Sequence, residues 1–195
     1  MKKIIPAKAI LIPDNAKRVF KGVIFDVYQW PQTEFDGSVK TYEMVRRPDT
    51  VVIIGVVGGK LLIIDEQQPH VDRYLTFPTG KIDSAGDSPL IAAQREMKEE
   101  TGYEFAKWRL INVMQPHLKL EWFVHVFVAS EGRQSTAGPE AGEKIKVVPL
   151  PFDEVRRLSF ARKGYLAKSE DIFRAADKVE DLLNLPEFEG LEVDR

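Results

Sequence analysis

The sequence predicts a mixed α/β (α+β) fold, with a mixed sheet, helices, and a small additional β-sheet unit at the N-terminal end. Three observations favour this fold. The chain is β-rich up to about residue 46, Thr50–Val57 is an unbroken run rich in β-branched residues, and a helix pattern begins at Pro89. An unbroken apolar run of that length is typical of a strand buried on both faces. We therefore expect an N-terminal β unit in residues 1–46 and the main domain in residues 47–195.

The N-terminal elements are predicted from β-rich runs and turn residues. Residues 4–12 and 19–30 have strand character, the second with a bend at Gly22. Asp36-Gly37 is a hairpin signal that leads into a strand at 39–45, and Gly58-Gly59 connects Thr50–Val57 to a strand at 60–65.

One helix has clear signals at both ends. Ser88 is a suitable N-cap and Pro89 suits the first helical position, while Gly102 is the expected stop after Glu100 or Thr101. Further strands are expected at 109–114, 122–129 and 145–150. Two amphipathic helices are expected at 152–158 and 169–183, followed by a loose tail after Pro186.

The composition excludes several classes of function. The 195 residues carry 28 basic and 30 acidic side chains, so charge gives no reason to expect a nucleic-acid or membrane partner. No run reaches the length of a membrane span, and no cleavable signal follows Met1, so we expect a cytoplasmic protein. The absence of cysteine excludes disulfides and thiolate chemistry. Catalysis must then use carboxylates, His, Lys, Ser or a bound metal.

Glu96, Glu99 and Glu100 form the most informative cluster. At spacing i, i+3 and i+4 their carboxylates point the same way on a helix and repel one another. A divalent cation relieves that repulsion, and oxygen-only ligands favour Mg²⁺ or Mn²⁺, which serve diphosphate hydrolysis. The alternative is an ordinary solvated face of a Glu/Lys-rich helix.

The segment from Gly80 to Tyr103 resembles the Nudix box, G-x5-E-x7-R-E-U-x-E-E-x-G-U, in which U is a bulky apolar residue. The matching residues are Arg95-Glu96-Met97-x-Glu99-Glu100-x-Gly102-Tyr103. The flanks at 42–51, 65–68 and 77–80 are similar to those of the ADP-ribose pyrophosphatase branch of the family. The resemblance implies a Nudix-type α/β/α sandwich in which the N-terminal β unit mediates homodimerisation.

The resemblance also implies an activity. It is the hydrolysis of the P–O–P bond in a nucleoside diphosphate linked to another moiety, with ADP-ribose or another ADP-sugar giving AMP and a sugar phosphate. Alternatives are another nucleotide sugar, a dinucleotide or a nucleoside triphosphate as substrate, or a ligand sensor with little turnover.

Roles for individual residues follow from the same resemblance. Glu96 and Glu100 are the implied metal ligands, with Glu99 a third ligand or bridged by water, and the backbone carbonyl of Thr79 completes the site. Arg95 orients the carboxylates. The general base is Glu143 or Glu140, in the loop before the strand at 145–150.

The candidate substrate-binding residues lie elsewhere in the chain. They are Glu43, Arg46, Arg47, Arg73 and His117, and Glu121 is a further candidate to face the metal site.

The chain departs from the Nudix pattern at two places. Six positions rather than five separate Gly80 from the acid, which is Asp87 rather than Glu, so we expect an altered rate or metal preference. Gln67-Gln68 stand where the dinucleotide-sugar branch often carries an arginine, and Arg73 is the candidate replacement.

Overall fold

The computed structural model describes residues 2–69, 71–82, 87–135, 144–161 and 165–194. The chain divides into two compact units. The first comprises Met1–Thr50, Val113–Val124 and Glu189–Arg195, and the second comprises Val51–Asn112 and His125–Phe188. Each unit is described by itself below. No described helix is both long enough and apolar enough to span a membrane.

The first unit is built on a four-stranded sheet. Its order is β10 (Leu120–Glu121), β4 (Val39–Arg46), β3 (Asp26–Thr33) and β2 (Lys17–Lys21). The predicted hairpin between β3 and β4 is confirmed, and Gly37 in its turn has a φ of 83°, a backbone conformation that favours glycine. β10 pairs with β4 in parallel while the other strands are antiparallel, so this sheet is mixed.

The ends of the chain differ from expectation. The predicted strand at 4–12 stops early, because β1 spans only Lys2–Ile5 and a turn then closes with a hydrogen bond from the Ala9 amide to the Pro6 carbonyl. The tail is not loose throughout, since β13 (Leu191–Asp194) pairs antiparallel with β1. Ile12, beyond the turn, is buried with Trp30 and Met44 in a small core.

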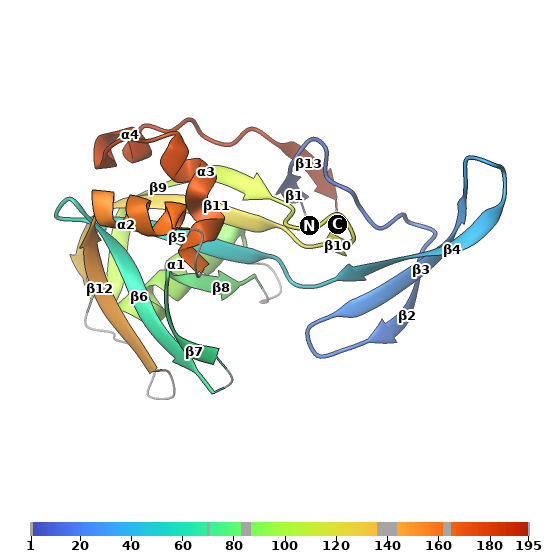
Figure 1. The fold of residues 1–195 in the computed structure, drawn as a ribbon, viewed down its shortest axis with the longest axis horizontal. Helices are drawn as coiled ribbons and strands as arrows, with labels where there is room; N and C mark the ends of the chain where they lie inside the picture. Colours follow the sequence, from blue (N-terminus) through green and yellow to red (C-terminus); the bar gives the residue numbers. More distant parts are fainter. Residues whose placement is uncertain (1, 70, 83–86, 136–143, 162–164, 195) are drawn as a thin grey trace. The chain divides into compact units, whose positions relative to one another are not determined.

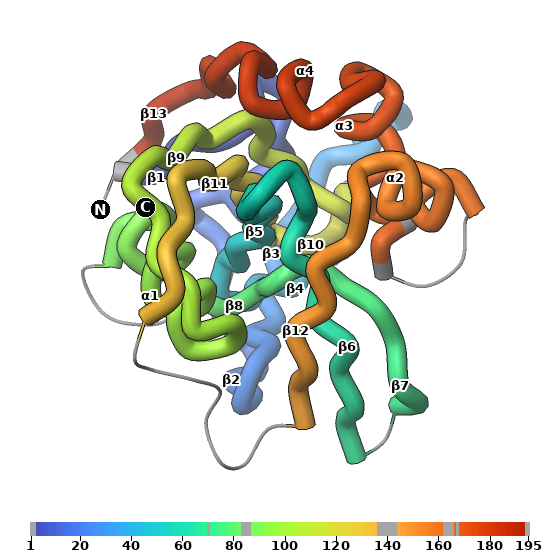
Figure 2. The backbone as a smooth tube through the Cα atoms, turned by 90° about the vertical axis from the view of Figure 1, so that its left-hand side faces the viewer, coloured from blue at the N-terminus to red at the C-terminus, as the bar shows by residue number. Residues whose placement is uncertain are grey.

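The second unit contains a seven-stranded sheet with the main path β12-β6-β5-β11-β9, in which β7 pairs with β6 and β8 with β5. The strands are β5 (Thr50–Val57), β6 (Lys60–Gln68), β7 (Val71–Thr76), β8 (Thr79–Lys81), β9 (Tyr103–Met114), β11 (Val124–Gln134) and β12 (Lys144–Pro151). Gly58 and Gly59, both with positive φ, form the predicted turn between β5 and β6. Figure 2 shows β12, β6 and β7 running side by side.

Helices cover both faces of this sheet (Figure 1). On one face, α1 (Pro89–Thr101) packs Ala92, Ala93 and Met97 into a core shared with Val51 and Ile53 of β5. The opposite face carries Val56, which lines a hollow together with Leu183 at the end of α4 (Val179–Leu183). The sheet therefore lies between helical layers, and the predicted fold class is confirmed.

The predicted helix at 169–183 is wrong as a single element. The structure has α2 (Phe152–Phe160), the 3₁₀ helix η1 (Tyr165–Ser169), α3 (Glu170–Arg174) and then α4. Arg156 explains the break, because its Nε donates to the Phe173 carbonyl at 3.1 Å and its Nη2 to Asp177 Oδ1 at 3.0 Å. Those contacts hold the chain in a turn between α3 and α4.

Candidate active site

The ends of α1 fix where its acidic side chains lie. Ser88 caps the helix by accepting a hydrogen bond from the Ile91 amide at 3.2 Å, and Pro89 occupies the first turn. Gly102 ends the helix in the left-handed conformation with a φ of 71° and donates to the Lys98 carbonyl. Both termini are as predicted, so the three glutamates fall in the last two turns of the helix.

Glu100 is fixed by the strand that precedes the helix. Its carboxylate is 8% exposed and accepts a hydrogen bond at Oε2 from the Thr79 amide, 2.9 Å away. The neighbouring Pro78 carbonyl accepts from the Ile53 amide at 2.9 Å, which attaches this strand to β5. Glu100 therefore lies beside the Thr79 backbone, and this contact is made by the Thr79 amide rather than by the carbonyl that is the candidate metal ligand.

Arg95 connects the other two glutamates. Its Nη1 lies 2.7 Å from Glu96 Oε1 and 3.4 Å from Glu99 Oε2, and its Nη2 donates to the Lys81 carbonyl at 3.1 Å. Asp87, the acid of the lengthened loop, lies 4.0 Å from Arg95 Nε. Charge-assisted contacts of this kind orient carboxylates strongly. The contact of Arg95 with the Lys81 carbonyl could not be predicted from a local sequence pattern, because the two residues are 14 positions apart.

Position 80 requires glycine because the Glu96 side chain occupies the space of a Cβ, and not because of the backbone conformation. A Cβ placed on Gly80 would overlap the Glu96 carboxyl group, and the φ of Gly80 is not positive. The Glu96 side chain thus lies directly over the main chain at this glycine.

The atoms near α1 that could bind a metal are all carboxylate or carbonyl oxygens, which are the ligands that a hard divalent cation prefers. Among the residues that the structure describes, however, no three His, Asp or Glu side chains converge as a ready metal cluster. Glu96 and Glu99 contact Arg95 instead, and Glu100 accepts from the Thr79 amide. A bound cation would therefore compete with these internal partners.

Most candidate substrate-binding residues lie in the first unit. Glu43 accepts a hydrogen bond from Gln29 at 2.7 Å, and His117 Nδ1 accepts from the Lys119 amide at 3.2 Å. Arg46 lies over the Tyr28 ring and forms an ion pair of 2.8 Å with Glu121.

Glu121 does not have the character expected of a residue that faces a metal. It is 5% exposed and accepts at Oε2 from the Ile12 amide at 2.6 Å, in addition to its ion pair with Arg46. Its carboxylate is thus committed to holding the Ile12 segment and β4 within the first unit. These contacts give no support to the expectation that Glu121 faces the metal site, which stays a prediction.

Arg47 has the most unusual environment of these candidates. Its guanidinium carbon lies 4.5 Å from the centre of the Trp122 ring and 5.7 Å from that of Phe25. Its Nε is buried, with no hydrogen-bond partner within the described part of the chain. Burial lowers the pKa of Arg47, whereas the Asp49 carboxylate raises it. The contacts of Arg47 with these two rings could not be predicted from the sequence, because Phe25 and Trp122 are far apart along the chain.

The remaining candidates fall in or near the second unit. Arg73 of β7 is paired with Asp65 of β6 through contacts of 2.7 Å on the exposed hairpin. Glu140 and Glu143, the candidate bases, lie outside the described residues.

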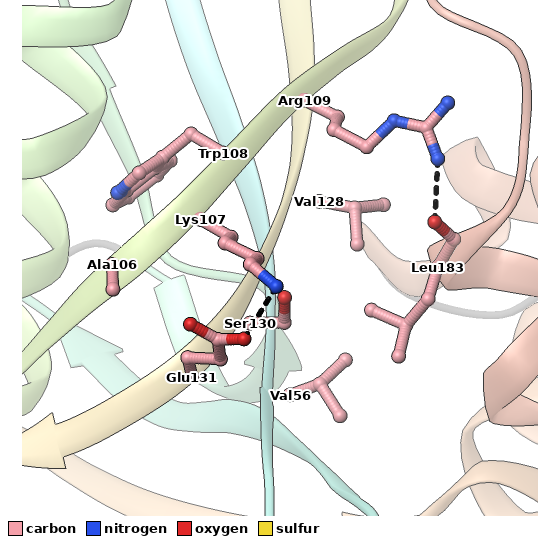
Figure 3. A pocket seen from close by; sticks show the side chains of 9 residues that line it. All are labelled: Val56, Ala106, Lys107, Trp108, Arg109, Val128, Ser130, Glu131 and Leu183. Atoms are coloured by element: carbon pink, nitrogen blue, oxygen red, sulfur yellow. Dashed lines mark hydrogen bonds and ion pairs between the residues drawn. The ribbon is translucent and has the colours of Figure 1, made fainter.

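A hollow of about 740 Å³ on the second unit is separate from this cluster. Figure 3 shows Val56, Val128 and Leu183 directed into it, with a Lys107–Glu131 ion pair at one edge. Arg109 closes another edge by donating to the Leu183 carbonyl. No glutamate of α1 lines the hollow, so it is not the candidate active site.

The model of the NUDIX domain matches residues 46–169 of this chain. The chain belongs to the Nudix family. The match includes the whole of α1 with Arg95 and the three glutamates, and it confirms the resemblance drawn from the sequence. Nudix hydrolases generally use divalent metal ions, in agreement with the all-oxygen donor set.

Curated relatives of this Nudix chain match most of its length. The ADP-ribose pyrophosphatase of Bacillus subtilis (strain 168) is 28% identical over 159 residues, which are 78% of this chain and 85% of that protein. The methanol dehydrogenase activator of Bacillus methanolicus is 27% identical over 140 residues, 69% of this chain and 75% of that protein. The ADP-sugar pyrophosphatase of Mus musculus is 29% identical over 140 residues, 61% and 63% of the two chains.

A solved structure of similar fold is the crystal structure of an ADP compounds hydrolase. It has a TM-score of 0.63 at 23% identity and covers 91% of this chain and 94% of its own. At that identity the likeness supports the Nudix fold.

Proposed function

We propose that this Nudix pyrophosphohydrolase cleaves the P–O–P bond of ADP-ribose or another ADP-sugar, releasing AMP and a sugar phosphate. The observation that carries the proposal is the contact of Arg95 with both Glu96 and Glu99 on the helix that also presents Glu100. Relatives named ADP-ribose pyrophosphatase and ADP-sugar pyrophosphatase support the substrate class.

In the proposed mechanism Glu96 and Glu100 would hold Mg²⁺ or Mn²⁺, Glu99 would add a ligand directly or through water, and the Thr79 carbonyl would complete the set. When bound, the cation neutralises diphosphate oxygens and makes water easier to deprotonate. Arg95 keeps the Glu96 and Glu99 carboxylates in position. Glu143 or Glu140 takes the proton from the attacking water as general base.

The residues proposed to bind the substrate are Glu43, Arg46, Arg47, Arg73 and His117. Arg47 has the strongest support, because its buried Nε lacks a partner within the described residues and an anionic substrate group would supply one. Arg46, Glu43, His117 and Arg73 already have partners within the protein, so a substrate would have to share or displace those contacts.

We propose further that residues 1–46 act as an N-terminal β unit that forms a homodimer, and residues 47–195 as the Nudix hydrolase domain. Among the described residues, all but two of the large hydrophobic side chains that are exposed belong to the first unit. Val19, Phe20 and Val39 of its sheet are each more than half exposed. Exposed apolar surface of this kind is typical of an interface.

A turnover screen tests the substrate. Purified protein with Mg²⁺ or Mn²⁺ is offered ADP-ribose, other nucleotide sugars, dinucleotides and nucleoside triphosphates, and AMP and sugar phosphate are followed separately. The dinucleotides are included because one relative is named as an activator of a dehydrogenase. AMP from ADP-ribose, abolished by EDTA, is the expected result.

Two other outcomes revise the proposal. Faster cleavage of a different diphosphate keeps the mechanism and discards the ADP-sugar substrate. Full turnover in the presence of EDTA contradicts the role given to Glu96 and Glu100.

A further inference from the structure

A groove of about 600 Å³ lies along the outer side of α1 in the second unit. Its volume is in the range of small-molecule sites. Ile91 borders it and is 50% exposed, whereas the neighbouring Ala92 and Ala93 are buried in the core. The groove therefore opens on the solvent side of the helix, and β9 and β11 supply its other walls.

The floor of the groove is aromatic and held in place. Phe105 and Trp108 of β9 meet edge to face with ring centroids 5.9 Å apart. The Trp108 Nε1 donates to the Phe105 carbonyl at 3.0 Å, and its ring also contacts Phe127. Because its only hydrogen-bond donor is used within the protein, the indole offers a ligand an apolar surface in a fixed position.

The charged side chains that line the groove are the cations Arg95, Lys98 and Arg133 and the acids Glu104 and Glu131. The Glu104 carboxylate forms ion pairs with two cations, Lys98 Nζ at 2.7 Å and Arg133 Nη2 at 3.3 Å. The hydrogen bond and charge of Lys98 hold the pKa of Glu104 below its ordinary value, and Arg133 adds to the effect. Glu131, the other acid of the lining, is paired with Lys107 at 2.6 Å.

Arg133 is the cation most accessible to a ligand. Its side chain is 81% exposed, and its contact with Glu104 is the longer of the two that Glu104 makes. An acidic group on a ligand that rests against Trp108 would meet Arg133 at the rim. Cations beside an aromatic surface are complementary to a flat ring that bears an acid group.

We infer that this groove binds an aromatic anion, with its ring against Trp108 and Phe105 and its acidic group on the exposed side of Arg133, the cation that Glu104 holds less closely. The inference does not depend on which diphosphate the enzyme cleaves, because the groove lies on the face of α1 opposite its core contacts. Arg95 borders the groove and also contacts Glu96 and Glu99, so the test below uses Trp108 and Arg133, which are outside the candidate active site.

The test uses naphthalene-1-sulfonate as the probe and the indole N–H signals in ¹H–¹⁵N NMR spectra as the readout. The chain has three tryptophans, and the signal of Trp108 is assigned by its loss in Trp108→Phe. Trp30 belongs to the first unit and serves as the internal control. We expect a saturable shift of the Trp108 signal, and weaker or no saturation with neutral 1-naphthalenemethanol or with sulfate alone.

Charge reversal at the rim distinguishes a site from nonspecific adsorption. Arg133→Glu is expected to weaken binding of the sulfonate about fivefold or more, while Arg157→Glu, an exposed change away from the groove, leaves it unaltered. The inference is overturned if Trp108 shows no saturable shift, if all three indoles shift alike, or if both variants bind equally well.

Discussion

The two units of this chain bury their apolar residues very differently. In the second unit, α1 and the sheet share a core of nine buried residues, among them Ile53, Leu62 and Met97, each 0% exposed. In the first unit, a cluster among the described residues consists of Ile12, Trp30 and Met44, with Ala16 and Tyr28 packed against it. Yet the first unit holds nearly all of the large hydrophobic side chains that are exposed in the described residues.

The sheet of the second unit is covered by helices, whereas the sheet of the first unit exposes apolar side chains to solvent. In the second unit, helices cover both faces of the sheet and α1 shares a buried core with it. The first unit has few residues behind its sheet and leaves Phe20, Val23 and Phe35 in solvent, which suits association better than independent stability.

Loss of one carboxylate in the second unit is expected to abolish chemistry without altering the fold. Glu100→Gln keeps an acceptor for the Thr79 amide but removes the charge, so kcat is expected to fall about a thousandfold. Steady-state kinetics and a melting curve measure the two properties. Glu104→Gln is the control, since Glu104 contacts Lys98 and Arg133 rather than the site. Retained turnover in Glu100→Gln would exclude the metal-ligand role.

Core truncation is expected to cost more in the second unit than in the first. Leu62→Ala, at a 0% exposed position, should lower the free energy of unfolding by about 4 kcal/mol, and Met44→Ala by about 2 kcal/mol. The smaller cost follows because the three-residue cluster around Met44 can relax into a cavity more easily. Urea unfolding followed by circular dichroism measures both. Equal losses would contradict the proposed contrast in packing.

Polar substitutions on the first unit's sheet are expected to weaken association and leave folding almost unchanged. Phe20 and Val39 are 59% and 64% exposed and lie on one face of the sheet. The double change Phe20→Ser and Val39→Ser should raise the dimer dissociation constant at least about tenfold. Sedimentation equilibrium measures it, with Leu90→Ser, on an exposed part of α1, as the control. A monomeric parent protein would refute the dimer outright.

The smallest effect concerns two depressed carboxyl pKa values with different causes. Asp36 in the first unit is lowered by hydrogen bonds from the Ser38 hydroxyl and amide, and Glu104 in the second mainly by Lys98. Salt screens charges more than it screens hydrogen bonds, so 1 M NaCl should raise the pKa of Glu104 and leave that of Asp36 nearly constant. Carboxyl ¹³C shifts measured against pH report both values.

The two lowered pKa values predict that acid reduces the stability of the folded protein. Because both folded-state pKa values lie below those of the unfolded chain, each group stabilises the protein above its ordinary pKa and loses that contribution as the pH falls through the lower value. A salt response of equal size at the two sites would contradict the assigned causes.

Local signals in the sequence were sufficient for the elements that carry the candidate site. Ser88, Pro89 and Gly102 delimited α1 correctly, and Gly58-Gly59 and Asp36-Gly37 located two hairpins. Each of these signals acts within a few residues, through a cap, a fixed φ or a left-handed turn. The Nudix pattern itself is also contained in one loop and one helix.

What could not be predicted depends on residues that are distant along the chain. The pairing of β1 with β13 joins Lys3 to Val193, and the Arg46–Glu121 ion pair joins β4 to β10. The helical pattern at 169–183 was correct in period, but Arg156, from another helix, imposes a break through Phe173 and Asp177. Such tertiary contacts override local propensity without leaving a mark in the local sequence.

Gly80 has a consequence for how this chain could diverge. The Glu96 carboxyl group, and not the φ of Gly80, excludes a side chain at this position. We therefore expect Gly80→Ala to fold while displacing the Glu96 carboxylate. In a library that covers every substitution, selection for abundance should tolerate changes at position 80 that selection for turnover removes. A substitution at Gly80 alone would then give a protein that retains the fold and loses catalytic turnover.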